Sequence, residues 1–338
     1  MASGGNINIL AIESSCDETS AAVIQNGKVL SNHIATQKVH ERFGGVVPEL
    51  ASRAHMQNIV PVVEAAINDS GLGKHDFNAV AFTQSPGLLG SLLVGACFAK
   101  SFAQASSIPL IAVHHMQAHV LAHFIESAPE FPFLCLTVSG GHTQIVLCRD
   151  HLDMEVLGET IDDAAGEAFD KVAKMLGLPY PGGPLVDKLA ALGDPLKFKF
   201  PLSEMKDYQF SFSGLKTSVM YFLQAQKKID PEFVANNLND ICASVQYTII
   251  KMLMTKLQKA AKELKIKHIG IAGGVSANSG LRKALQEAGA KNGWTVYIPK
   301  FEYCTDNAAM IGITGYYKFL KGAFTDLSAN PSARATWI

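Results

Sequence analysis

Two histidines lie four residues apart in the stretch HHMQAH, residues 114–119. On a helix, His115 and His119 would project from the same side, because residues separated by four positions are surface neighbours. Zinc proteases of the H-E-x-x-H kind use this spacing, with a Glu after the first His as the general base. Met116 occupies that position here and cannot accept a proton. The stretch therefore favours metal binding and disfavours a protease.

The histidine at 123 continues the same spacing after His119. Each step of four residues turns a helix by about 400°, so His123 lies ~80° around the helix from His115. We expect it beside the metal ligands or on the surface, not among them. His114 is expected to end the preceding strand.

Turns of small residues offer a second kind of chemistry. Residues 14–17 (SSCD) and 139–142 (SGGH) each join two apolar, strand-like segments. Glycine lets backbone N–H groups approach an anion closely. The two turns could hold phosphate groups between them, or they could be ordinary hairpin turns. His142 is expected to form hydrogen bonds near the phosphates.

A third glycine turn follows a strand in HIGIAGGVSANSGLR, residues 268–282. Gly273 and Gly274, with Asn278 near the start of the next helix, suggest a nucleotide contact. The turn lacks the G-x-G-x-x-G order of a dinucleotide site, and the chain has no G-K-[ST] ending of a Walker A loop. On its own, this pair of glycines is a weak signal.

Acidic residues mark residues 162–184, DDAAGEAFDKVAKMLGLPYPGGP. Asp163, Glu167 and Asp170 are spaced to share one face of a helix. Three acids on one face usually form a solvated surface. These acids precede a Pro-Gly-rich loop, which is more typical of a ligand-binding wall, where a carboxylate could accept hydrogen bonds from ribose hydroxyls.

The elements that must position these residues alternate between strands and helices, which predicts an α/β architecture. The predicted strands are INILAI, AAVIQ, KVLSNHI, FNAVAFT, LIAVH, FLCLTV, TQIVLC, KHIGIAG and WTVYIP. The predicted helices are 48–70, 88–106, 115–125, 163–176, 184–193, 213–227, 232–265, 279–291 and 306–321. Residues 9–24 also align without a gap on residues 133–148, which suggests two copies of one structural plan.

Length and composition indicate two lobes without covalent staples. The chain has 338 residues, of which 48% are hydrophobic, and a net charge of -1. The six cysteines form no C-x-x-C pair, which fits reduced thiols in a cytosol. No stretch reaches the ~18 uninterrupted apolar residues of a membrane span. We expect a cytoplasmic protein that does not associate with membranes.

Lysines crowd one predicted helix at 251, 256, 259, 262, 265 and 267. A solvated helix face is one interpretation. Contact with nucleic-acid phosphates is the other, and affinity would then fall steeply with salt. Because the whole chain is not basic, such a partner would need a local patch or help from another subunit.

With these parts in view, the sequence resembles the bacterial TsaD family of tRNA threonylcarbamoyladenosine transferases. The resemblance extends from residue 9 to 313 and rests on IESSCDETSAAV, GGVVPELASRAH, HHMQAH, VSGGHTQIV, DAAGEAFDKVAKMLGLPYPGGP, FSFSGLKT, AGGVSAN and TDNAAMIG. It implies the two-lobed fold of actin, sugar kinases and Hsp70, with a duplicated βββαβαβα core and nucleotide in the interlobe cleft. The lobes would be 1–128, completed by a helix at 306–325, and 129–305. An extended tail, 326–338, would carry Arg334 and Trp337.

The resemblance also implies an activity and a set of site residues. The threonylcarbamoyl group of threonylcarbamoyl-AMP would pass to the exocyclic amine of the adenosine 3′ of the anticodon in tRNAs reading ANN codons, and AMP would leave. One divalent metal per subunit, Fe(II) or Zn(II), would be held by His115, His119 and Asp306. Substrate contacts would come from Thr137, Val138, Ser139, Gly140, Gly141, Asp170, Gly183, Asp187 and Asn278, with Glu13 a candidate catalytic residue and Glu13 and Ser14 near phosphate. The implied partners are tRNA, the paralogous subunit TsaB and the small ATPase TsaE.

Three rival functions stay open at this stage. A kinase or ATPase of the same fold is disfavoured by the histidines, because Mg²⁺ prefers oxygen ligands. A metalloprotease is disfavoured by Met116. A noncatalytic scaffold would be distinguished by assay with candidate partners.

Overall fold

The computed structural model describes residues 5–334, which form two compact units. Unit 1 contains the described residues of Met1–Pro129, Asp150–Met154 and Pro299–Ile338, and unit 2 contains Glu130–Arg149 and Glu155–Ile298. Two stretches that the sequence assigned to the second lobe, 150–154 and 299–305, belong to unit 1. Trp337 of the predicted tail lies outside the described residues.

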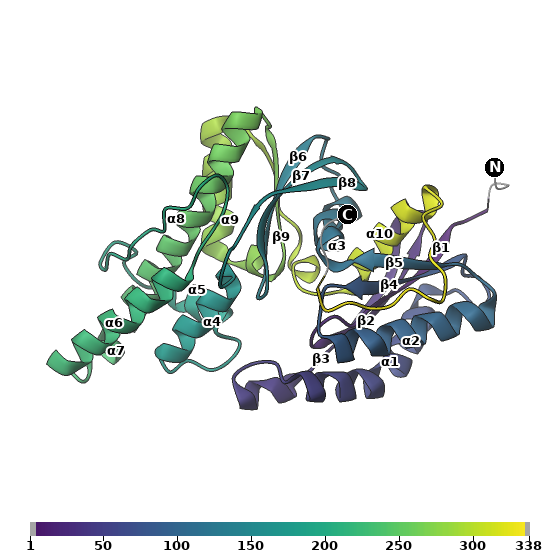
Figure 1. Ribbon diagram of the computed structural model, residues 1–338, viewed down its shortest axis with the longest axis horizontal. Helices are drawn as coiled ribbons and strands as arrows, with labels where there is room; N and C mark the ends of the chain where they lie inside the picture. The colour runs from purple at the N-terminus through teal and green to yellow at the C-terminus, as the bar shows by residue number, and fades with distance from the viewer. Residues whose placement is uncertain (1–4, 335–338) are drawn as a thin grey trace. The chain divides into compact units, whose positions relative to one another are not determined.

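Unit 1 is built on a five-stranded sheet in the order β3-β2-β1-β4-β5. Its strands are β1 (Asn8–Glu13), β2 (Glu18–Gln25), β3 (Lys28–Thr36), β4 (Ala79–Ser85) and β5 (Leu110–His114). Its helices are η1 (Lys38–Phe43), α1 (Pro48–Ser70), α2 (Leu89–Ser106), α3 (His115–Leu121), η2 (Ala122–Ile125), η4 (Phe301–Tyr303) and α10 (Ala308–Leu320). Figure 1 shows α1 and α2 on one side of this sheet and α10 on the other.

Alternation along β1 supplies both sides of the core of unit 1, because successive strand residues point to opposite faces. Leu10 and Ile12 pack with the residues of α1 and α2. Ile9 and Ala11 pack with the residues of α3 and α10. Glu13 continues this second face as its polar end.

Helix α10 lies very close to the sheet because two of its residues have no side chain. A Cβ atom at Gly312 would lie 2.3 Å from Ile24, and one at Gly315 would lie 2.7 Å from Ala81. Both distances are well inside van der Waals contact, so these positions require glycine. The close approach brings the first turn of α10 against the strands β2 and β3.

Unit 2 is built on a sheet in the order β10-β9-β6-β7-β8. Its strands are β6 (Phe133–Val138), β7 (Thr143–Asp150), β8 (Asp153–Glu159), β9 (His268–Ala272) and β10 (Thr295–Tyr297). Its helices are α4 (Ala165–Met175), α5 (Gly182–Ala190), α6 (Ser213–Ile229), α7 (Phe233–Asn236), α8 (Leu238–Leu264), η3 (Gly274–Ala277) and α9 (Ser279–Asn292).

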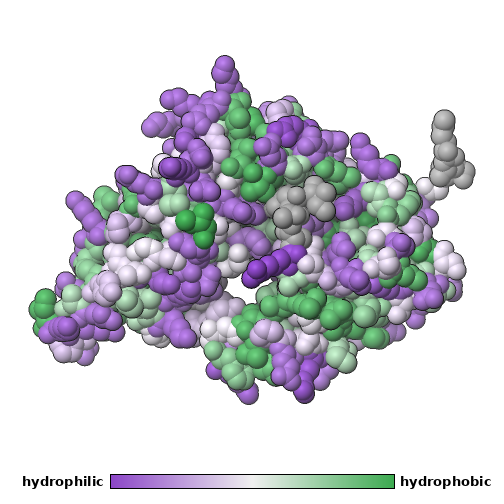
Figure 2. Space-filling view, in the orientation of Figure 1, coloured by the Kyte–Doolittle hydropathy of each residue, from purple (hydrophilic) through white to green (hydrophobic). Residues whose placement is uncertain are grey.

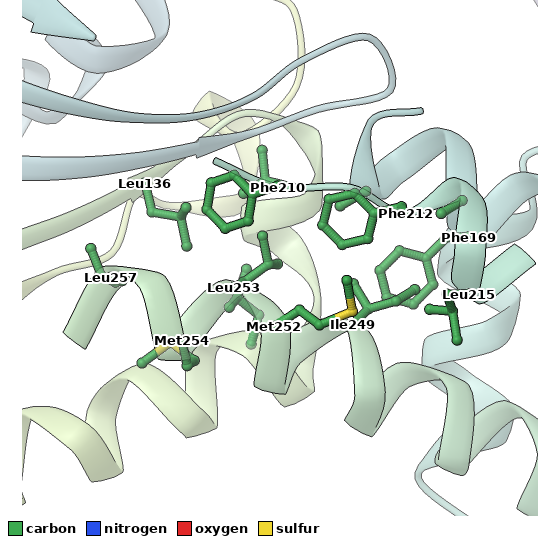
Figure 3. Packing of buried hydrophobic residues seen from close by; sticks show 14 of the residues in the cluster. Leu136, Phe169, Phe210, Phe212, Leu215, Ile249, Met252, Leu253, Met254 and Leu257 are labelled. Atoms are coloured by element: carbon green, nitrogen blue, oxygen red, sulfur yellow. The ribbon is translucent and has the colours of Figure 1, made fainter. Parts of the chain in front are cut away.

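The core of unit 2 joins the sheet to α8 through aromatic residues of the FSFSGLKT stretch. The rings of Phe210 and Phe212 are stacked with centroids 6.2 Å apart, and both side chains are fully buried. Figure 3 shows them beside Leu253 and Ile249 of α8. This stretch therefore serves the packing of unit 2.

The duplication predicted from sequence is confirmed by the pairing of the two hairpins. In β1 and β2, Glu13 pairs with Ser20 in antiparallel register. In β6 and β7, Thr137 pairs with Gln144, which are the residues aligned with that pair. The two sheets also share one strand order, since β8-β7-β6-β9-β10 follows the plan of β3-β2-β1-β4-β5.

Two predicted helices are corrected, and one strand was not predicted. The strand β8 was not among the predicted segments, because this edge strand is mostly half-buried or exposed and lacks an apolar run. The predicted helix 232–265 is two helices, separated at Asn237, whose backbone leaves the helical region. Helix α4 begins at Ala165, so Asp163 precedes the helix and does not share its face.

Within residues 5–334, no helix is both long enough and apolar enough to cross a lipid bilayer. Hydrophilic residues cover much of the face shown in Figure 2, and hydrophobic residues form separate patches there.

Candidate metal centre

His115 and His119 meet Asp306 in unit 1. His115 is the first residue of α3, directly after β5, and its ring is perpendicular to that of His119, with centroids 4.7 Å apart. Asp306 comes from the segment before α10, 187 positions after His119. Its Oδ1 lies 3.3 Å from Nε2 of His115 and 3.1 Å from Nε2 of His119. One ligand atom from each residue lies within 4.8 Å of the others.

Glu13 lies behind His115, on the opposite side of its ring from Asp306. Its Oε2 is 3.1 Å from Nδ1 of His115, and its side chain is fully buried. The carboxylate also accepts hydrogen bonds from the backbone N–H of Ser15 and from the hydroxyl of Thr83. Such a carboxylate fixes the orientation and tautomer of a ligand histidine. Glu13 is thus placed to hold His115.

The two carboxylates and His115 shift one another's protonation. Burial acts to lower the pKa of His115, but Asp306 and Glu13 outweigh it and raise that pKa well above 6.5. Burial acts to raise the pKa of Asp306, yet the charge and hydrogen bond of His115, with a smaller effect of His119, leave it lowered. The pKa of Glu13 is likewise lowered by His115 against the effect of burial. The two ionised carboxylates therefore hold a positive charge on His115, which a metal cation could replace by displacing the proton.

These residues fit a divalent transition metal. Two imidazole nitrogens and one carboxylate oxygen are the donor set of non-haem iron and of catalytic zinc sites, which keep positions open for substrate. The side chain of Asp306 is 22% exposed, whereas that of His119 is 1% exposed. The group is therefore reached from solvent on the side of Asp306.

Three residues near His115 and His119 in the chain, His114, Met116 and His123, are not part of the His-His-Asp group. His114 ends β5 as predicted. His123 is buried in η2, not on the surface, and is not part of the His-His-Asp group. Met116 is 1% exposed, so the position of a protease's base is occupied by a core residue.

The predicted substrate residues gather separately in unit 2, at the carboxyl ends of β6 and β9. These strands are parallel, with Thr137 beside Ala272. The turn after β6 is closed by hydrogen bonds between Ser139 and His142 and accepts one from the N–H of Gly166 in α4. Ligands of open α/β sheets bind at this end of the strands.

Glycines in these loops fall into two groups. A Cβ atom at Gly273 would lie 2.5 Å from the carbonyl oxygen of Val138, and one at Gly166 would lie 2.5 Å from that of Ser139. These two glycines allow the loops to pack together. By contrast, a Cβ atom at Gly140, Gly141 or Gly274 would have no atom within 4 Å, and none of these three residues has a left-handed backbone. Packing does not explain glycine at these three positions, whereas close approach of a ligand would.

The other predicted substrate residues connect the loops of unit 2. Asp170 accepts hydrogen bonds from the N–H groups of Gly182 and Gly183, and burial raises its pKa even though these bonds lower it. Asp187 accepts hydrogen bonds from the backbone and hydroxyl of Ser279. Asn278 caps α9 and donates to Gln246.

Thr137 and Val138 are fully buried, backbone included, so the structure exposes neither residue to a ligand. Thr83, Gln246 and Ser279 were missed by sequence reasoning. Only Thr83 could have been identified from sequence, because it lies in the carboxyl-end half of the predicted strand β4, where polar residues are typical of ligand sites.

The acidic and basic surfaces of unit 2 require two corrections. Asp163 forms ion pairs with Lys171 and Lys216, so it serves the fold and not a ligand wall. Lys256 donates hydrogen bonds to the carbonyl groups of Met205 and Asp207, and burial lowers its pKa. Lys256 is therefore not placed to contact nucleic acid, whereas Lys251, Lys259, Lys262, Lys265 and Lys267 are exposed.

The two duplicated α/β units have the fold of the actin, sugar kinase and Hsp70 class. The solved structure of full-length HypF in the phosphate- and nucleotide-bound form matches 93% of this chain with a TM-score of 0.60 and 14% identity. HypF of T. kodakarensis matches 94% with a TM-score of 0.60 and 14% identity. The chain spans about half the length of these solved chains, at 46% and 48%. At this identity the likeness concerns the fold alone.

Sequence comparison gives the family. The sequence profile of TsaD, described as tRNA N6-adenosine threonylcarbamoyltransferase, matches residues 28–313. A protein of that name from Christiangramia forsetii is 64% identical over 332 residues, covering 97% of this chain and 98% of the relative. Another from Cytophaga hutchinsonii is 58% identical over 332 residues, covering 97% of each. The chain belongs to the TsaD family.

Proposed function

We propose that the chain transfers a threonylcarbamoyl group from threonylcarbamoyl-AMP to the exocyclic amine of the adenosine 3′ of the anticodon in tRNAs reading ANN codons. A bond forms between that amine and the carbamoyl carbon, while the bond from this carbon to the phosphate oxygen breaks. AMP leaves with the bonding electrons, and the amine gives up one proton to solvent. Family membership supports the reaction, and the observation that carries it is the meeting of His115, His119 and Asp306.

The metal would be Fe(II), with Zn(II) as the alternative, one per subunit. When bound by these three residues it supplies Lewis acidity and a template for substrate oxygens. Glu13 keeps His115 oriented through Nδ1, which leaves Nε2 toward Asp306. The buried side of the group excludes water from His119, while Asp306 faces the open side.

The adenylate would bind to the loops of unit 2. Gly140 and Gly141, in the turn after β6, have no side chain that would keep a ligand away from their backbone N–H groups. The same holds for Gly274, in the loop after β9. Short distances from backbone to phosphate favour such turns as anion sites. Asp170 binds the N–H of Gly183 at the start of α5, Asp187 binds Ser279 at the start of α9, and Asn278 caps α9. We assign these residues to the substrate site because these helix starts lie in unit 2 with the two turns.

The tRNA would contact the end of α8 and the turn after it. Lys259, Lys262 and Lys265 are exposed there, and Glu263 is the acidic residue among them. A chain of net charge -1 offers few other phosphate contacts. We therefore include the paralogous subunit TsaB and the small ATPase TsaE as partners that complete the active assembly, and we place the reaction in the cytoplasm because its substrate is tRNA.

The test is a reconstituted reaction read by mass spectrometry of tRNA nucleosides. The chain, loaded with Fe(II), is incubated with threonylcarbamoyl-AMP and an ANN-decoding tRNA, with and without the two partners. We expect threonylcarbamoyladenosine at one position, at a low rate alone and at a higher rate with partners. The Asp306→Ala variant is the matched control and should give none. Peptide cleavage or sugar phosphorylation in place of this product would support a rival function.

A further inference from the structure

A row of polar side chains ends one face of the unit 1 sheet. Glu13 of β1 pairs with Ser20 of β2, and Ala22 of β2 pairs with Asn32 of β3. Directly paired residues have their side chains on the same face. The body of this face is apolar and packs against α3 and α10. Glu13 and Ser20 end this face, and Asn32 lies one pair further in, next to Ser20. Together, these three residues form the polar row.

Two members of this row bind the first turn of α10. The N–H of Ala308 donates to the hydroxyl of Ser20 at 2.9 Å, and the N–H of Ala309 donates to Oδ1 of Asn32 at 3.3 Å. The hydroxyl of Ser20 also lies 3.5 Å from Oδ1 of Asn32. The first N–H groups of a helix have no partner inside the helix. Here the strands supply those partners.

The third N–H of α10 is bound within the helix start itself, because Met310 donates to Oδ1 of Asn307 at 3.0 Å. Asn307 is fully buried and directly follows Asp306 in the chain. The segment that carries Asp306 is thus continuous with a helix end tied to β2 and β3. The same row, through Glu13, holds His115.

We propose that Ser20 and Asn32 are positioning residues for the metal centre: by binding the first two N–H groups of α10 they set where Asp306 meets the two histidines. One row of strand residues then aligns both sides of the donor set, with Glu13 acting on His115 and Ser20 and Asn32 acting on Asp306. The inference rests on the metal centre of the proposed function. The other interpretation is that Ser20 and Asn32 only stabilise α10.

The experiment measures metal affinity and ligand geometry, without activity. The double variant Ser20→Ala, Asn32→Ala is loaded with Co(II), affinity is measured by competition with a chelator, and the visible absorption spectrum reports the coordination. Loss of partners that orient metal ligands lowers affinity about 10-fold to 100-fold. We expect a loss in this range and an altered spectrum. Asn32→Asp combined with native Ser20 keeps an acceptor for Ala309, so it should not lower the affinity and should leave the spectrum unchanged.

Ser31→Ala is the matched control for a purely structural role. Ser31 is the neighbour of Asn32 on β3, is buried, and donates to the carbonyl of Ala66 at 2.6 Å toward α1. Its loss should lower thermal stability but leave Co(II) affinity and spectrum as in the parent chain.

Parent affinity and spectrum in a folded double variant would overturn the proposal, as would equal losses in Ser31→Ala. If the double variant does not fold, the two single variants are compared with Ser31→Ala by the same criteria. If the parent chain itself binds no Co(II), while Asp306→Ala is identical to it, the metal centre fails and the inference fails with it.

Discussion

Glu13 and His115 form a buried pair in which the carboxylate Oε2 lies 3.1 Å from Nδ1 of the imidazole. Because Nδ1 is engaged there, the lone pair of Nε2 is the one left to bind a metal. Asp306 lies on that Nε2 side, at 3.3 Å. Protonation of the His115 ring and any metal binding at its Nε2 are therefore coupled.

Removing any single donor should release the metal. His115→Ala, His119→Ala and Asp306→Ala should each lose about one equivalent per chain, because two remaining donors bind a divalent metal weakly. His123→Ala should retain it, since His123 is not part of the group. Elemental analysis beside circular dichroism checks this. If the His115 and His119 variants fold and still retain the metal, these two residues are not its ligands.

Glu13→Gln should weaken metal binding while leaving the three donors in place. We expect a loss of about 10-fold to 100-fold in affinity, the usual effect of changing the group that orients a ligand histidine. Chelator competition measures it. Thr83→Val is the control, since Thr83 touches Glu13 and not His115, and its effect should be smaller. An equal effect of both changes would indicate that Glu13 acts only through packing.

Acid should compete with the metal at His115. In the metal-free chain Asp306 and Glu13 hold the pKa of His115 above 6.5 in spite of burial. Because the pKa of His115 is higher in the folded chain than in the unfolded chain, protonation of His115 stabilises the folded state. This contribution to the free energy of unfolding is complete below the unfolded pKa and is lost as pH rises through the folded pKa. Metal must displace that proton, so metal affinity should rise with pH until the folded pKa is passed. Chelator competition across pH tests this, and an affinity independent of pH would contradict it.

Bulk at the open glycines should block the adenylate without harming the fold. Gly140→Val and Gly274→Val introduce side chains where the structure has free space, so unfolding temperature should change little while affinity for AMP falls by at least 10-fold. Gly214→Val, also in open space within unit 2, is the control and should bind normally. Calorimetry with AMP gives the result. Unchanged affinity in both variants would make these turns purely structural.

Charge reversal at the end of α8 should weaken tRNA binding and should also make the tRNA affinity depend less steeply on salt concentration. Lys259→Glu, Lys262→Glu and Lys265→Glu together remove three exposed cations, and each lost phosphate contact lowers the salt slope by about 1. Lys256→Met is the control, because Lys256 is bound to Met205 and Asp207. Binding is measured over a range of salt. A slope equal to that of the parent chain would place the tRNA elsewhere.

The sequence predicted the elements better than the contacts between distant ones. Periodicity located His115 and His119, since their relation is local to one helix. Asp306 followed only from family likeness, because 187 positions separate it from His119. Ser20 and Asn32 gave no signal, because the helix end they bind is distant in the chain. Asp163 and Lys256 were misjudged because spacing along a helix does not show which charges are already paired.

Unit 1 is completed by residues that are made after the whole of unit 2. Its first 129 residues supply the sheet, both histidines and Glu13, yet Asp306 and α10 follow only after the whole of unit 2. During synthesis on the ribosome, the apolar face of β1 and β2 must therefore wait for Gly312 and Gly315 before it is covered. A chain that stops before residue 306 lacks both that cover and the third residue of the candidate metal site, so this site can be completed only after unit 2 has been made.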